Sequence, residues 1–125
     1  MAIAQGKTAL IVDDSPILRK SLRTILEKNG FTVSGEAANG VEAIKLFKES
    51  KPDLVTIDIL MPQMGGIETL RFLKGLDPDV KAVMVSSLSE KEKVVECAKA
   101  GASHYILKPF DEGKVLEVLE KVLPA

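Results

Sequence analysis

The sequence TALIVDDS, Thr8–Ser15, joins a run of four apolar residues to two adjacent aspartates and a serine. A continuous apolar run of this kind is typical of a strand that is buried on both faces of a parallel sheet. Polar residues directly after such a strand lie at the carboxyl edge of the sheet, where open α/β sheets bind their ligands. The sequence therefore predicts a buried strand over Thr8–Asp13 and a polar site at its end.

Four further strand-like runs follow the first one, and a helix-like segment comes after each strand. The five strands are predicted over Thr8–Asp13, Phe31–Ala37, Asp53–Asp58, Lys81–Ser86 and His104–Leu107. This regular alternation is typical of the α/β class, here a doubly wound five-stranded parallel sheet with helices on both faces. The polar Thr32 and Ser34 indicate that the second strand lies at an edge of the sheet.

Capping residues mark the expected helix boundaries. Three helix starts carry one: Ser15 before Pro16, Asn39 with Glu42 three residues on, and Ser89 with Glu92 three residues on. Side chains of these types satisfy the free amides of a first helical turn. The last helix is predicted over Asp111–Leu123, with Val115, Leu119 and Val122 facing the core because they share one helical stripe.

The chain has 125 residues, with 17 basic and 18 acidic side chains and a formal net charge of −1. This length suits a single domain, predicted over residues 1–125 with its core at about 8–123, and the near-neutral balance argues against a general nucleic-acid coat. No apolar run approaches the ~20 residues that a membrane-spanning helix needs. The one cysteine, Cys97, cannot form an internal disulfide, so we expect a cytoplasmic protein.

Side chains that carry chemistry end four of the five predicted strands. They are Asp13 and Asp14 after the first strand, Asp58 after the third, Ser86 at the end of the fourth and Lys108 after the fifth. Three carboxylates in one crevice repel one another unless a cation is present, and Mg²⁺ prefers such oxygen ligands. A hydroxyl and an ammonium beside that cation suit the oxygens of a phosphoryl group, with one carboxylate as its acceptor.

Each of these residues also has an ordinary structural interpretation. Asp13 and Asp14 suit a turn and a helix cap, and a strand commonly finishes with a short polar side chain or a solvated lysine. Their joint placement at four strand ends favours the functional interpretation. The single histidine, His104, and Cys97 stand outside this pattern, and we interpret both as packing or surface residues.

Three segments of the chain carry recognisable motifs: LIVDDS (10–15), PDLVTIDILMP (52–62) and AGASHYILKPF (100–110). They resemble the hallmark motifs of the CheY-like receiver domains of two-component response regulators, of the stand-alone type. The order and spacing of the motifs extend the resemblance over about residues 8–123. The resemblance implies a flavodoxin-like fold with the strand order 2-1-3-4-5. It also implies a protein that is switched by phosphorylation and that catalyses only its own phosphorylation and dephosphorylation, so it is not otherwise an enzyme.

The resemblance assigns roles around the predicted acidic cluster. Asp58 matches the phosphoacceptor, which receives its phosphoryl group from a sensor histidine kinase. Asp14, Asp58 and the backbone carbonyl of Leu60 match the direct ligands of Mg²⁺, and Asp13 matches a residue that acts through water.

The resemblance also implies a switch and an output surface. Ser86 matches the hydroxyl that closes on the phosphoryl group, Lys108 its cationic partner, and Tyr105 the aromatic ring that turns inward when the hydroxyl moves. The Lys108-Pro109 peptide is expected to be cis. The changed surface would be the fourth helix, fifth strand and fifth helix, which carry Lys91, Lys93 and Lys99. It would bind a downstream target protein, in chemotaxis and motor control or in a phosphorelay. We expect a monomer that neither binds nucleic acid directly nor inserts into membranes.

Three alternatives stay open at this point. A phosphatase of the haloacid-dehalogenase type also forms an aspartyl phosphate, but it needs two aspartates separated by one residue, whereas Asp13 and Asp14 are adjacent. A flavodoxin-like electron carrier shares the sheet, but its phosphate loop is not acidic. The chain also suits an excised receiver of a multidomain transcription regulator.

Three positions depart from the family pattern or fall on its variable parts. Gly65 stands where many receivers carry Asp or Asn, which indicates a more mobile loop after the acceptor. Leu60 and Leu88 lie two residues beyond the acceptor and the switch hydroxyl, and both are apolar. We therefore expect them to hinder the hydrolytic water, so that self-dephosphorylation is slow.

Overall fold

Strands and helices alternate along residues 6–123, which are the residues that the computed structural model describes. The strands are β1 (Thr8–Val12), β2 (Thr32–Ala37), β3 (Leu54–Ile57), β4 (Lys81–Ser86) and β5 (His104–Leu107). The helices are α1 (Pro16–Lys28), α2 (Gly40–Ser50), α3 (Gly66–Leu76), α4 (Lys91–Lys99) and α5 (Glu112–Val122). No helix among these residues has the length and apolar character needed to cross a membrane.

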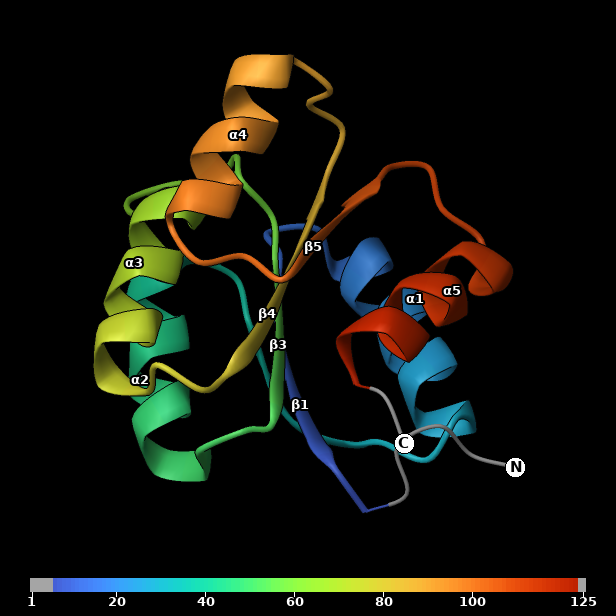
Figure 1. Cartoon of the computed structure of the whole chain (residues 1–125). Coiled ribbons are helices and arrows are strands. Elements are labelled where there is room, and N and C mark those ends of the chain that lie inside the picture. The colour runs from blue at the N-terminus through green and yellow to red at the C-terminus, as the bar shows by residue number, and fades with distance from the viewer. Residues whose placement is uncertain (1–5, 124–125) are drawn as a thin grey trace.

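The five strands form one parallel sheet in the order β2-β1-β3-β4-β5. Helices α1 and α5 cover one face of the sheet, and α2, α3 and α4 cover the other (Figure 1). The predicted α/β class, the doubly wound arrangement and the strand order are therefore confirmed. All five strands run in the same direction, so their carboxyl ends meet at one edge, at the top of Figure 1.

Strand β1 shows why its sequence is apolar without interruption. Successive side chains of a strand point to opposite faces. Ala9 and Ile11 accordingly pack into the core under α1 and α5, whereas Leu10 and Val12 pack into the core under α2, α3 and α4. All four are buried, since β1 is an interior strand of the sheet and helices cover both of its faces.

The strand boundaries agree with the prediction to within one residue. The ranges of β4 and β5 are as predicted, and β2 lies at a sheet edge as its polar residues indicated. Asp13 and Asp58 fall just outside their strands, yet each still donates its backbone N–H to the neighbouring strand, Asp13 to the Ala37 carbonyl at 2.9 Å and Asp58 to the Val12 carbonyl at 3.0 Å. The backbone of both acidic residues is thus fixed by the end of the sheet.

Two of the three predicted helix caps are present. Ser15 Oγ accepts the Leu18 N–H at 3.3 Å, and Asn39 Oδ1 accepts the Glu42 N–H at 2.8 Å. Asp111 caps α5 by accepting the Lys114 N–H at 2.8 Å, so this helix begins one residue later and ends one residue earlier than predicted. The stripe of Val115, Leu119 and Val122 is buried as expected.

The predicted cap at Ser89 is wrong. The residue that precedes α4 is Glu90, and it makes no side-chain capping bond. Ser89 stands one residue too early, because the loop between β4 and α4 is held elsewhere: Leu88 donates its N–H to Ser86 Oγ and accepts a hydrogen bond from the Tyr105 hydroxyl. A contact with a distant strand therefore sets where this loop turns into the helix.

Candidate functional site

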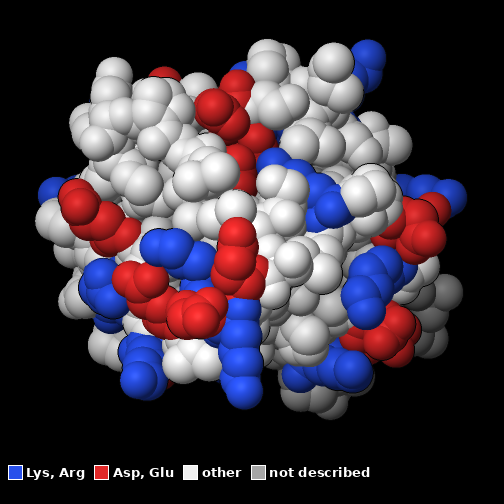
Figure 2. All heavy atoms as spheres, turned by 90° about the horizontal axis from the view of Figure 1, so that it is seen from above, with Lys and Arg blue, Asp and Glu red and all other residues white. Residues whose placement is uncertain are grey.

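The three predicted acidic residues meet at the carboxyl edge of the sheet. Carboxylate oxygens of Asp13, Asp14 and Asp58 all lie within 4.8 Å of one another. They come together because β1 and β3 are neighbours in register, with Val12 opposite Ile57, so that the residues after both strands share one place. Figure 2 looks down on this edge, where acidic and basic side chains meet within a largely uncharged surrounding.

Lys108 joins this acidic cluster from the end of β5. Its Nζ lies 2.8 Å from Asp13 Oδ2 and 3.5 Å from Asp58 Oδ2. The Lys108 N–H donates to the Ser86 carbonyl at 2.9 Å, and the Lys108-Pro109 peptide is cis. One ammonium thus faces two of the three carboxylates, which leaves the cluster with an excess of negative charge.

The cluster holds its members in different environments. Asp13 and Asp58 are buried, at 1% and 6% exposure, whereas Asp14 is exposed. Burial raises the pKa of the Asp58 carboxyl above its ordinary value; the Lys108 ammonium opposes this shift and the charge of Asp13 adds to it. The charged form of Asp58 is therefore disfavoured in the absence of a further cation.

The donor set fits a hard divalent cation. It consists of carboxylate oxygens, which Mg²⁺ prefers, and one carboxylate, that of Asp14, faces solvent and can accommodate the waters that Mg²⁺ retains. Such a cation would also stabilise the charged form of Asp58, which burial and the charge of Asp13 both disfavour. The side chain of Leu60 points to solvent with 59% exposure, which leaves its predicted role to its backbone carbonyl.

Ser86 and Tyr105 are linked through one residue of the β4–α4 loop. Ser86 is buried at the end of β4, and its Oγ accepts the Leu88 N–H at 3.3 Å. The Tyr105 hydroxyl donates to the Leu88 carbonyl, and the partly buried ring packs against the core under α2, α3 and α4. Burial raises the pKa of this hydroxyl. The backbone N–H and carbonyl of Leu88 thus connect the Ser86 hydroxyl with the Tyr105 ring.

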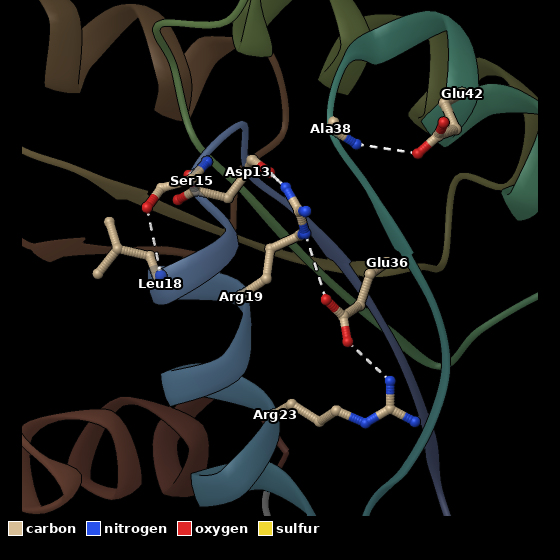
Figure 3. A network of polar contacts seen from close by, with 8 residues as sticks. All are labelled: Asp13, Ser15, Leu18, Arg19, Arg23, Glu36, Ala38 and Glu42. Carbon is tan, nitrogen blue, oxygen red and sulfur yellow. Dashed lines mark hydrogen bonds and ion pairs between the residues drawn. The ribbon is translucent and has the colours of Figure 1, made fainter.

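Two further residues support the site, and the sequence prediction missed their contacts. Gly66, at the start of α3, packs so closely that a Cβ there would collide with the Asp58 carbonyl oxygen. Arg19, one turn into α1, donates from Nη1 to the Asp13 carbonyl (Figure 3). The glycine pair at 65 and 66 was a visible signal for the first contact, whereas nothing in the spacing of Arg19 points to the second.

His104 and Cys97 have structural surroundings. His104 Nδ1 accepts the Tyr105 N–H at 2.8 Å, and Cys97 is buried in the core under α2, α3 and α4. Burial raises the pKa of the Cys97 thiol, which disfavours the reactive thiolate. Both observations agree with the packing roles expected from the sequence.

Known proteins share this fold and much of this sequence. The profile of the response regulator receiver domain matches residues 9–120. The chain is 45% identical to the chemotaxis protein CheY of Thermotoga maritima over 117 residues, 94% of this chain and 98% of that protein. It is 44% identical to CheY of Bacillus subtilis over 114 residues, 91% and 95% of the two chains.

A solved structure with the same fold contains BeF3 and Mg²⁺. A chain of the crystal structure of the CheX-CheY-BeF3-Mg²⁺ complex from Borrelia burgdorferi superposes with a TM-score of 0.93 at 36% identity, covering 97% of this chain and 92% of that chain. These findings do not favour the phosphatase, the electron carrier or the excised transcription regulator. Receiver domains are signalling proteins rather than enzymes in the usual sense. The chain belongs to the response regulator receiver domain family.

Proposed function

We propose that this receiver accepts a phosphoryl group on Asp58 from a sensor histidine kinase and that Mg²⁺ is its cofactor. The observation that carries the proposal is the cluster itself: three carboxylates with oxygens within 4.8 Å of one another and the Lys108 ammonium 3.5 Å from Asp58. A cation at this place suits a phosphoacceptor, because the charge on the phosphoryl oxygens must be neutralised beside Asp58.

The proposed reaction is an in-line displacement at phosphorus. A carboxylate oxygen of Asp58 attacks, the new bond joins that oxygen to phosphorus, and the bond from phosphorus to the donor's imidazole nitrogen breaks. Asp14, Asp58 and the Leu60 carbonyl would hold Mg²⁺ directly and Asp13 through water; the cation supplies neutralisation of the phosphoryl oxygens. Lys108 already faces Asp13 and Asp58, and it would hold another phosphoryl oxygen from the side of β5.

The proposed switch uses the link through Leu88. Ser86 Oγ now accepts the Leu88 N–H, and as a donor it would turn to a phosphoryl oxygen instead. Leu88 would then be free to move, and with it the Tyr105 hydroxyl that donates to the Leu88 carbonyl. A local charge change would thereby alter the α4, β5 and α5 surface.

That surface is the proposed binding site for a downstream target protein. It includes the lysines of α4, namely Lys91, Lys93 and Lys99, and the β5 residue Tyr105. We propose a monomeric receiver that forms one unit over about residues 8–123, acts in the cytoplasm beside its kinase and serves chemotaxis or a phosphorelay. The T. maritima and B. subtilis relatives named as chemotaxis proteins favour the first of these pathways.

The phosphoacceptor is tested with a small phosphodonor. The protein is incubated with acetyl phosphate and Mg²⁺ and its intact mass is followed, beside an Asp58→Ala variant and a sample with EDTA. We expect one phosphoryl adduct that requires both Asp58 and Mg²⁺. An adduct that persists in Asp58→Ala, or in EDTA, would overturn the proposal.

The target surface is tested separately with a phosphoryl mimic. Wild type treated with beryllofluoride and Mg²⁺ is compared with untreated protein in a pull-down, and a Tyr105→Ala variant is treated in the same way. We expect a protein that is captured only by treated wild type. Equal capture by treated wild type and treated Tyr105→Ala would place the target on another surface.

A further inference from the structure

Arg19 connects α1, the end of β1 and β2 next to the acidic cluster. It lies in the first turns of α1, its Nη1 donates to the Asp13 carbonyl after β1, and its Nε lies 3.2 Å from Glu36 Oε1 on β2 (Figure 3). The arginine side chain is mostly buried, with 17% of it exposed. Arg19 itself is not among the groups that we assign to phosphoryl transfer.

The carbonyl that Arg19 holds belongs to the peptide that joins Asp13 to Asp14. The other polar groups of Asp13 are also occupied: its N–H donates to Ala37, Oδ1 accepts the Ser15 N–H at 2.9 Å and Oδ2 accepts from Lys108. The hydrogen bond from Arg19 to the Asp13 carbonyl also fixes the orientation of the peptide plane between Asp13 and Asp14. The direction in which the Asp14 side chain leaves the backbone follows from that plane, and Asp14 is the exposed member of the cluster.

Glu36 keeps the Arg19 guanidinium in place. Its two oxygens are shared between two arginines, Oε1 with Arg19 and Oε2 with Arg23 Nη1 at 2.7 Å. The planar guanidinium of Arg19 donates from Nε to the Glu36 carboxylate and from Nη1 to the Asp13 carbonyl. A lysine ammonium has no such fixed pair of donors. Arg23 has the same carboxylate partner but no contact with Asp13, and 42% of its side chain is exposed.

We propose that Arg19 is a positioning residue for cation binding, which fixes the Asp13-Asp14 peptide so that the Asp14 carboxylate faces the site that Asp13 and Asp58 complete. The proposal rests on the proposed function, since it presumes that the cluster binds Mg²⁺. Arg19 would contact neither the cation nor the phosphoryl group. Its effect passes through a backbone carbonyl, as residues that orient metal ligands commonly act.

Charge and positioning predict opposite effects when Arg19 is neutralised. Removing a positive charge near an acidic cluster strengthens the binding of a cation if Coulomb attraction is the only factor. Loss of the contact that holds the Asp13-Asp14 peptide weakens cation binding if Arg19 positions Asp14. The sign of the change in Mg²⁺ affinity therefore separates the two explanations.

The test is a calorimetric Mg²⁺ titration of wild type, Arg19→Gln and Arg23→Gln. Arg23→Gln is the matched control because it makes the same change in charge beside the same carboxylate. We expect Arg19→Gln to bind Mg²⁺ about tenfold more weakly, a typical loss when an orienting contact of a metal ligand is removed. Arg23→Gln should stay within about twofold of wild type, since exposed charges at a distance are screened. Urea unfolding in EDTA, run on all three proteins, reports any loss of fold stability separately.

The measured Mg²⁺ affinities of these variants either support or overturn the positioning role of Arg19. Equal or tighter Mg²⁺ binding in Arg19→Gln, or an equal loss in Arg23→Gln, would overturn the positioning role. If Arg19→Gln does not fold, Arg19→Lys replaces it, and a smaller loss in the same direction is expected; wild-type affinity in that variant would also overturn the proposal. Wild-type protein that binds no Mg²⁺ would instead refute the proposed function.

Discussion

The Lys108 ammonium lies 2.8 Å from Asp13 Oδ2, so an ion pair joins the end of β5 to the end of β1 across two intervening strands. Both side chains are largely buried, at 15% and 2% exposure. Removing one member of such a pair leaves the other charge buried without compensation, which is more costly than the net gain from the pair itself. Lys108 therefore matters both for the fold at this edge and for the chemistry that we propose there.

Replacing Lys108 with Met should affect both properties. We expect the free energy of unfolding to fall by about 3 kcal/mol, the low end for breaking a buried ion pair. The rate of phosphorylation by acetyl phosphate should fall roughly a hundredfold, because a preorganised cation is lost from the site. Urea unfolding and intact-mass kinetics measure the two effects. Lys121→Met serves as the control, since Lys121 makes only an exposed pair with Glu117; a Lys108→Met rate equal to that of the control would contradict the assigned role.

Asp58→Asn should stabilise the protein when Mg²⁺ is absent. The pKa of Asp58 is raised in the folded state by burial, so its charged form costs stability at pH values above that pKa, and the cost disappears as the pH falls below the ordinary pKa of an aspartate. We expect Asp58→Asn to be more stable than wild type by about 1 kcal/mol at neutral pH in EDTA, a usual gain at a strained functional site. The difference should vanish in acid and shrink when Mg²⁺ is added. Urea unfolding across pH measures it, and a gap that widens toward low pH would refute the account.

A pair of buried threonines gives a matched test of the core. Thr56 Oγ1 on β3 is buried and has no hydrogen-bond partner among the described residues. Thr69 on α3 is equally buried, but its hydroxyl donates to the Gly65 carbonyl at 2.8 Å. We expect Thr56→Val to raise the free energy of unfolding by about 1 kcal/mol and Thr69→Val to lower it by a similar amount. Changes of the same sign in both variants would contradict the inferred hydrogen bonding.

The sequence was sufficient to predict the sheet and the position of the acidic cluster. The apolar run of β1 required burial on both faces, and in a parallel sheet the carboxyl ends of adjacent strands meet, so Asp13, Asp14 and Asp58 had to lie close together. The local pattern and the rules of parallel sheets predict the strands and the edge at which these residues lie, whereas the adjacency of β1 and β3 was implied by the resemblance to receiver domains.

The contacts that the sequence did not reveal depend on atoms that are distant along the chain. The contact between Arg19 and the Asp13 carbonyl depends on Glu36, which lies on another strand. The start of α4 depends on the bond from the Tyr105 hydroxyl to Leu88, and therefore the local signal at Ser89 was misleading. Side-chain geometry of this kind is set by tertiary packing, which overrides local capping preference.

Two glycines of α3 should respond in opposite ways to alanine. A Cβ at Gly66 would collide with the Asp58 carbonyl oxygen and the Ile59 backbone, whereas a Cβ at Gly75 meets nothing within 4 Å. Gly75→Ala should therefore stabilise the protein by roughly 0.5–1 kcal/mol, the usual gain within a helix. Gly66→Ala should destabilise it by about 2 kcal/mol, typical of steric strain, and slow the phosphorylation of Asp58. Thermal unfolding and intact-mass kinetics test this, and a Gly66→Ala variant with wild-type values for both would show that the α3 start can shift without consequence.

The two leucines beside the acceptor and the switch hydroxyl should prolong the life of the phosphoryl group. Leu60 is exposed at the mouth of the site, and Leu88 packs partly against the core while its backbone holds Ser86 and Tyr105. Neither side chain can orient a hydrolytic water, and Leu60→Asn or Leu88→Glu would supply an oxygen that can do so. We expect each variant to lose its adduct severalfold faster after the phosphodonor is removed, an effect at the lower end of what a positioned polar group contributes. Intact mass followed over time measures the decay, with Val95→Asn as a control at another exposed apolar residue, on α4. Unchanged lifetimes in both leucine variants would show that another feature of the site limits access of water to the phosphoryl group.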